Sequence, residues 1–268
     1  GASALCGAEG QITSNTGKAN IAIGYNAAFC MSSGACNTFL GESGKYVTTG
    51  SHNIGIGKLA GGSAVTATGS CNISFGYYAG CCLTSGFQNI LIGQNVGKTL
   101  TSGYDNIALG CNAMSDGAVT GACNIAIGIR ALKKVVAGGQ NIAIGEGAGC
   151  STTYANNNIF IGQKAGNNNV GGARNIAIGL DVELNEANDQ LAIGCCGSRW
   201  IEGDSSFNTT LAGIATVYSA TGIVSATKFC GDGSALTGIS AGGFSPDDDQ
   251  NLFASNTCSG CNLDGSSG

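Results

Sequence analysis

Apolar and small residues alternate within a short pattern that recurs along most of the chain. The pattern opens with Asn, continues with an apolar residue, a residue that is most often Ala and a second apolar residue, and closes with Gly, as from Asn141 to Gly145. This period of two predicts a short β-strand with its two large apolar residues on one face. The ten copies open at Asn20, Asn37, Asn53, Asn72, Asn89, Asn106, Asn124, Asn141, Asn158 and Asn175.

The spacing of these copies predicts how the strands are arranged. Successive copies open 15 to 19 residues apart, and a degenerate eleventh copy opens at Gln190. Self-similarity at a fixed short period is typical of a solenoid, in which one unit cannot bury its apolar face alone but stacked units can. We therefore predict an all-β, repetitive parallel β-solenoid whose stacking buries the Ile face. Ten strands at a spacing of ~4.8 Å would form a rod about 50 Å long.

Two residue types, Gly and Asn, recur at fixed positions in the repeats. The closing Gly fits a corner that needs positive φ or close backbone approach. A second Gly lies three residues before the Asn in nine of ten copies, with Ala155 as the exception. The Asn side chains could form a ladder of stacked amides or could each support an Asx turn, and the sequence leaves both open. Both roles are structural.

Departures from the repeat divide the chain into four segments. Residues 1–19 are expected to be the end of a preceding repeat, and residues 20–200 the solenoid with a cap. Residues 201–243 are expected to form a β-rich connecting module, and residues 244–268 a linker and the start of a further repeat block. Because both ends fall within incomplete repeats, we expect a longer parent chain. Trp200 follows the last copy, and we favour a role in closing the core over an exposed ligand-stacking role.

Composition and charge argue against several classes of function. Of 268 residues only 10% are charged, and the formal net charge is −5, so we predict no nucleic-acid partner. No apolar run reaches the ~18 residues of a membrane-spanning helix, so we predict no membrane insertion. The single histidine, His52, leaves no Ser-His-Asp arrangement and reads as an exposed turn residue. The acids are scattered, so we predict no enzymatic activity and no cofactor.

Fourteen cysteines raise the question of disulfides and metal sites. Cys36, Cys71 and Cys123 each precede a repeat Asn on non-adjacent strands, whose spacing of at least ~9.6 Å exceeds the ~7 Å that a disulfide allows between Cα atoms. We interpret most cysteines as small buried apolar residues, with disulfides in some columns as the alternative. Cys258 and Cys261 form a lone C-x-x-C without a second pair, so we predict no metal site.

The repeated Asn-Ile-Ala-Ile-Gly pattern, with its Ala-Gly and Thr-Gly steps, resembles the repeats of phage tail fibres and related virion adhesins. The stretch from Gly222 to Gly238 is similar to a motif in fibres of phages that infect marine cyanobacteria. A second similarity is to the heads of trimeric autotransporter adhesins, which form a trimeric, left-handed parallel β-roll. The repeats of those heads are usually shorter than the repeats of this chain.

This resemblance implies a homotrimeric virion tail fibre, extracellular, with a rigid shaft or head that supports attachment to the host cell surface. Its partners would be two further copies of the chain and a surface glycan or protein receptor. Candidate contact residues are the turn aromatics Tyr46, Tyr78, Tyr104 and Tyr154. The alternatives are a bacterial trimeric surface adhesin head and a single-chain secreted solenoid, either enzymatic or ice-binding.

Overall fold

A computed structural model describes residues 16–62, 66–206 and 209–211. The chain divides into two compact units, Gly1–Ala215 and Thr216–Gly268, and the described residues belong to the first. They form one sheet of thirteen strands in chain order, which confirms the all-β solenoid. The strands are β1 (Ile21–Ile23), β2 (Thr38–Leu40), β3 (Ile54–Ile56), β4 (Ile73–Phe75), β5 (Ile90–Ile92), β6 (Ile107–Leu109), β7 (Ile125–Ile127), β8 (Ile142–Ile144), β9 (Ile159–Ile161), β10 (Ile176–Leu180), β11 (Leu191–Cys195), β12 (Ser198–Gly203) and β13 (Thr209–Leu211).

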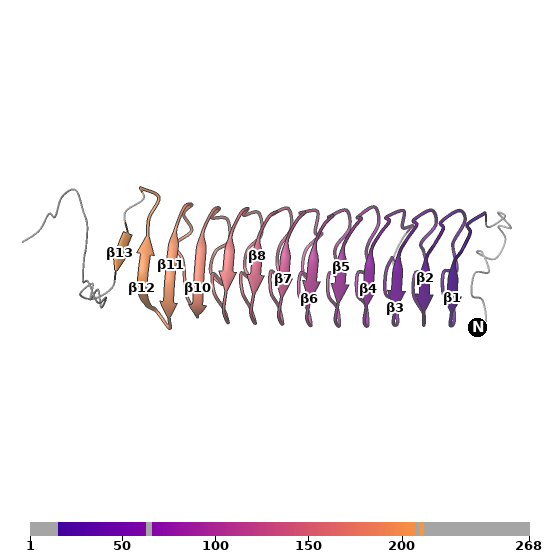
Figure 1. Cartoon of the computed structure of the whole chain (residues 1–268), viewed down its shortest axis with the longest axis horizontal. Coiled ribbons are helices and arrows are strands. Elements are labelled where there is room, and N and C mark those ends of the chain that lie inside the picture. The colour runs from indigo at the N-terminus through magenta and orange to yellow at the C-terminus, as the bar shows by residue number, and fades with distance from the viewer. Residues whose placement is uncertain (1–15, 63–65, 207–208, 212–268) are drawn as a thin grey trace, which may run out of the picture. The chain divides into compact units, whose positions relative to one another are not determined.

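Each repeat forms one turn of the solenoid, which we call a rung. Strands β1 to β11 pair in parallel with their neighbours, so equivalent residues of successive repeats lie side by side, as Ala126 lies beside Ala108 and Ala143. Figure 1 shows these strands stacked in chain order. Backbone hydrogen bonds also join the segments between the strands, for example from Gly44 N–H to Ala60 C=O at 2.8 Å. The repeat length therefore sets the register.

The second residue of the repeat strands, and not the flanking Ile pair, points into the solenoid. Ala108, Ala126 and Ala143 are completely buried. The flanking apolar residues point outward, and Ile21, Ile23 and Phe75 are more than half exposed. The expectation that stacking buries the Ile face is therefore wrong for a single chain. The interior is filled by the inward strand residues and by apolar residues of the segments between strands, such as Val96 and Val119. We call the part of such a segment that leads to the next repeat Asn the returning segment.

Large residues enter the interior where glycines leave room for them. Phe39 is fully buried, and a Cβ added to Gly55 on the next strand would lie 2.7 Å from its ring. A Cβ on Gly44 would lie 2.4 Å from the same ring. Phe160 is likewise buried against Gly149 and Gly166. Because a real Cβ cannot approach a ring carbon so closely, these glycines are required by packing.

The glycine that closes each strand makes the expected corner. Gly145 has φ +135°, and a Cβ there would lie 2.4 Å from the carbonyl oxygen of Gly162 on the next rung. The glycine three residues before the Asn has a different constraint: a Cβ on Gly121 would lie 2.0 Å from the carbonyl oxygen of Gly138. Close approach between rungs thus explains both glycine positions.

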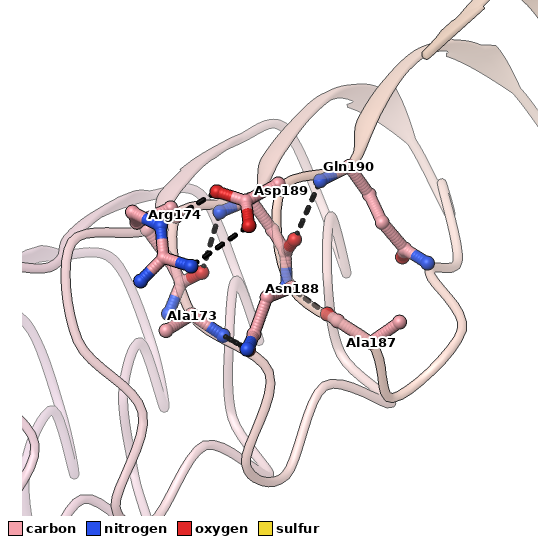
Figure 2. A network of polar contacts seen from close by, with 8 residues as sticks. Ala173, Arg174, Ala187, Asn188, Asp189 and Gln190 are labelled. Carbon is pink, nitrogen blue, oxygen red and sulfur yellow. Dashed lines mark hydrogen bonds and ion pairs between the residues drawn. The ribbon is translucent and has the colours of Figure 1, made fainter. Parts of the chain in front are cut away.

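Side-chain hydrogen bonds stand in for part of the backbone hydrogen bonding where residues 168–174 pack against residues 184–189. Asn168 Oδ1 accepts a hydrogen bond from Leu184 N–H at 2.9 Å, and Asn188 Oδ1 accepts one from Ala173 N–H at 2.7 Å. Arg174 binds both carboxylate oxygens of Asp189 at 2.6 and 2.7 Å. Figure 2 shows the contacts of Ala173 and Arg174 with Asn188 and Asp189. The irregular, charged stretch between residues 181 and 188 therefore stays attached to the stack.

Strands β12 and β13 end the sheet as an antiparallel extension. β12 pairs with β11 and β13 pairs with β12. Trp200 lies on β12 at a register irregularity opposite Ile193 and Gly194, and it is 61% exposed. The prediction that Trp200 closes the core is therefore wrong for the single chain. The backbone of β12 covers the edge of β11 instead.

Candidate functional site

The repeat asparagines form a continuous internal ladder. Asn106 Nδ2 donates hydrogen bonds to Asn89 Oδ1 at 3.1 Å and to the carbonyl oxygen of Gly121 at 3.0 Å. Asn106 Oδ1 accepts hydrogen bonds from the N–H and the Nδ2 of Asn124, both at 3.0 Å. Asn106 thus joins its neighbours along the stack and also the glycine turn of the next rung. The same contact to the glycine carbonyl of the next rung is made by the side chains of Asn37, Asn53, Asn72, Asn89 and Asn124. Of the two alternatives that the sequence left open, these contacts form the ladder, because both side-chain atoms of Asn106 bind residues of other rungs.

Almost all asparagines of this ladder are buried. Nine of the ten asparagines, Asn37, Asn53, Asn72, Asn89, Asn106, Asn124, Asn141, Asn158 and Asn175, are buried, and Asn20 is half-buried. Buried amides are costly unless donors and acceptors are paired, and here neighbouring rungs supply the partners. Gln190 continues the ladder only through its N–H, which donates to Asn175 Oδ1 at 2.8 Å. The ladder can position the backbone but offers no exposed reactive group.

The residue before each repeat Asn forms an exposed column with left-handed backbone. Cys36, His52 and Cys71 occupy successive rungs there, with φ between 57° and 60°, and all three are exposed. This confirms His52 as an exposed turn residue. Within residues 16–62, 66–206 and 209–211, no group of three His, Cys, Asp or Glu residues lies close enough together to hold a metal ion.

The cysteines are more accessible than the sequence suggested. All ten cysteines that the structure describes are free, and only Cys81 is buried. Cys36, Cys71, Cys123 and Cys196 are exposed, so their interpretation as buried apolar residues is wrong. Burial is the main cause that raises the pKa of the Cys81 thiol to about 12, and the neighbouring Cys82 raises it further. Cys258 and Cys261 lie outside the described residues.

The outward residues of the strands form one long apolar surface, which we call the outer strip. It comprises the first and third residues of β1 to β10, and Thr38 is its one polar member. Ile54, Ile92 and Ile144 are 38–39% exposed, and Ile21 and Ile23 at the first strand are 52% and 59% exposed. Ten rungs at ~4.8 Å give the outer strip a length of about 50 Å. It is therefore one continuous apolar surface and not a set of singly scattered apolar residues, which are normal on protein surfaces. The outer strip is therefore a candidate interface.

The four candidate tyrosines do not form one site. Tyr46 and Tyr78 are half-buried on the segment that follows the strand, whereas Tyr104 and Tyr154 lie on the returning segment and are 41% and 66% exposed. Sequence reasoning missed Phe87, which stacks on Tyr104 with ring centroids 4.9 Å apart and planes 4° apart. Both residues lie two positions before a repeat Asn, so comparing repeats by position could have found the pair.

Comparisons with known proteins leave the sequence and the geometry as the basis for assigning function. Among the described residues, no helix is long and apolar enough to cross a membrane. No protein-family model, curated protein or solved structure matches the chain.

Proposed function

We propose that this chain is a rigid structural and adhesive segment of an extracellular fibre, a virion tail fibre by its sequence resemblance, and that three copies pack their outer strips around a common axis. The observation that carries the proposal is the outer strip itself. A single chain satisfies its internal ladder yet leaves two columns of Ile-rich residues facing solvent. A second layer of apolar residues against this strip would complete the core.

The expected gain is large enough to support assembly. Full burial of an Ile side chain contributes about 1.5–3 kcal/mol, so covering a residue that is one-third exposed contributes about 0.5–1 kcal/mol. Over the outer positions of β1 to β10 this amounts to roughly 10–20 kcal/mol per chain. Each association step costs about 4–15 kcal/mol, and two such steps are shared by three chains. The balance favours the assembled form.

The solenoid suits a role in spanning distance and presenting side chains. Its rungs are joined by continuous backbone hydrogen bonds and by the asparagine ladder, which resist bending and separation. Three identical chains would present each exposed side chain three times, so that weak contacts add up to avidity. The segment would therefore support attachment to a host cell surface, either as a shaft or as a head.

The test changes the outer strip without changing the interior. In the variant Ile125→Lys/Ile127→Lys, both outward residues of β7 become cationic. We expect sedimentation velocity to show loss of the assembly, while circular dichroism keeps the β-signal, because six buried ammonium groups near one axis, two from each chain, are not compensated. The matched control is Val170→Lys, which changes a 39% exposed residue on the returning segment. An unchanged mass for the double variant would overturn the proposed interface.

A further inference from the structure

Basic residues collect on one side of the solenoid. We call the six residues after each strand-closing glycine the coil face, taken over the rungs of β2 to β9. It carries seven basic and three acidic residues. The basic residues are Lys45, Lys58, Lys98, Arg130, Lys133, Lys134 and Lys164, and the acids are Glu42, Asp116 and Glu146. The chain as a whole is acidic, so this face stands out against the net charge of −5.

The charge is also unequal along the stack. Residues 16–180 contain nine basic and four acidic residues, whereas residues 181–206 contain six acidic residues and one basic residue, Arg199. The acids at the far end include Asp181 and Glu183, which occupy the coil-face positions of the rung of β10. The basic region therefore has a defined extent of eight rungs, or about 35 Å from first to last at ~4.8 Å each.

Several of these lysines are available to a ligand. Arg130 is paired with Glu146 at 2.7 Å, and Lys133 with Asp116 at 3.0 Å. Within the described residues, the other five lysines of the coil face have no acidic partner within 4.0 Å. Lys58, Lys98 and Lys134 are exposed. The paired acids thus neutralise only part of the face.

Aromatic rings hold two of the ammonium groups in place. Lys45 Nζ lies 5.3 Å from the ring centroid of Tyr46, and Lys98 Nζ lies 5.6 Å from that of Tyr78. These cation–π contacts restrict the lysine side chains without removing their charge. Tyr77, which packs edge-on against Tyr78 at a centroid distance of 4.4 Å, is 44% exposed and adds an open aromatic surface.

The spacing of the cations indicates the shape of the ligand. The unpaired and exposed Lys58, Lys98 and Lys134 lie on the rungs of β3, β5 and β7, at intervals of two rungs, or about 10 Å along the stack. A small anion cannot span such intervals, and duplex DNA carries about one charge per 1.7 Å, far more than this face can neutralise. An extended chain with separated anionic groups and apolar ring faces fits both the lysines and the tyrosines.

We propose that the coil face binds an acidic polysaccharide laid along the stack. This inference rests on the proposed attachment role for its biological meaning and names the class of surface ligand, but binding by the coil face does not require trimers. The coil face and the outer strip are different parts of each rung, so one can bind a glycan while the other packs against further copies.

The experiment measures binding of alginate, a polyuronate, to the full chain by isothermal titration calorimetry, with neutral dextran as the control ligand. We expect alginate to bind, dextran not to bind, and affinity to fall as salt is raised. Lys98→Glu and Lys134→Glu should each weaken alginate binding by about three- to tenfold, as expected for exposed charge contacts. Lys18→Glu makes the same charge change on the returning segment and should alter affinity less than about twofold.

Each other outcome counts against the inference. Absence of alginate binding, equal binding of dextran, equal effects of Lys18→Glu and Lys98→Glu, or stronger binding of duplex DNA would overturn it. Measuring the native mass of the same samples separates it from the proposed assembly. A trimer that ignores alginate would overturn the polysaccharide site alone, and a monomer that binds alginate with the expected variant pattern would overturn the assembly alone.

Discussion

The asparagine ladder makes a prediction that distinguishes it from a simple turn role. Asn106 lies mid-stack, fully buried, and its side chain takes part in four hydrogen bonds as both donor and acceptor. Asn106→Asp keeps the acceptors that an Asx turn needs but removes the Nδ2 donors. It also directs a carboxylate oxygen at Asn89 Oδ1 and at the carbonyl oxygen of Gly121.

The structure gives the size of the effect. Asn106→Ala removes four hydrogen bonds and leaves the N–H of Asn124 buried without its acceptor. At about 1 kcal/mol per bond plus about 1–3 kcal/mol for the unsatisfied group, this should cost about 5–7 kcal/mol of unfolding free energy. Asn106→Asp should cost at least as much, because a buried carboxylate then faces two oxygen atoms. Gln94→Ala, at an exposed residue of the neighbouring rung, should stay within about 0.5 kcal/mol.

Urea denaturation followed by circular dichroism measures these differences, and amide hydrogen exchange at Asn124 reports the local loss. A solenoid can unfold rung by rung, so the exchange measurement is the sharper of the two. We expect exchange at Asn124 N–H to accelerate in both Asn106 variants. If Asn106→Asp were as stable as the parent chain, an acceptor alone would suffice and the ladder argument would be refuted.

Three further predictions concern single residues. Ser74→Ala should raise the unfolding free energy by up to about 1 kcal/mol, because Ser74 Oγ is buried without a partner, whereas Ser43→Ala should lower it by about 1–2 kcal/mol, because Ser43 Oγ donates to the carbonyl oxygen of Gly55 at 2.9 Å. Alkylation at neutral pH followed by mass spectrometry should modify exposed Cys36 quickly and Cys81 last, since the pKa of Cys81 is raised to about 12 and its thiol stays protonated. Gln140→Gly should stabilise the chain by about 0.5–1 kcal/mol in urea denaturation, because Gln140 has φ +59°. Stability unchanged or lowered by Gln140→Gly, or equal labelling of the two cysteines, would contradict these arguments.

The repeat made the architecture predictable, because the same strand, glycine corner and asparagine recur at a nearly constant spacing. A period of two defines two faces but does not say which one points inward. The bulk of Ile suggested the interior, yet Ala126 and its equivalents lie inside and the Ile residues outside. The clue was in the packing: Gly55 is small where Phe39 is large, which is expected only of positions that share an interior.

Other features could be found only once the residues were placed on the rungs. The exposure of Cys36 follows from its left-handed backbone before a buried Asn, a conformation that composition does not reveal. The exposure of Trp200 depends on β12 turning back along β11, which a pattern built from the parallel repeats does not contain. The basic coil face was present in the sequence, but the overall charge conceals it until Lys98 and Lys133 are counted by repeat position.

The native mass of the purified chain tests the central claim most directly, measured by light scattering under reducing conditions. The proposed trimer predicts a particle of three times the 26.4 kDa chain mass, held together without disulfides. A stable monomer, with its Ile columns facing solvent, would contradict the shared core and with it the trimeric fibre.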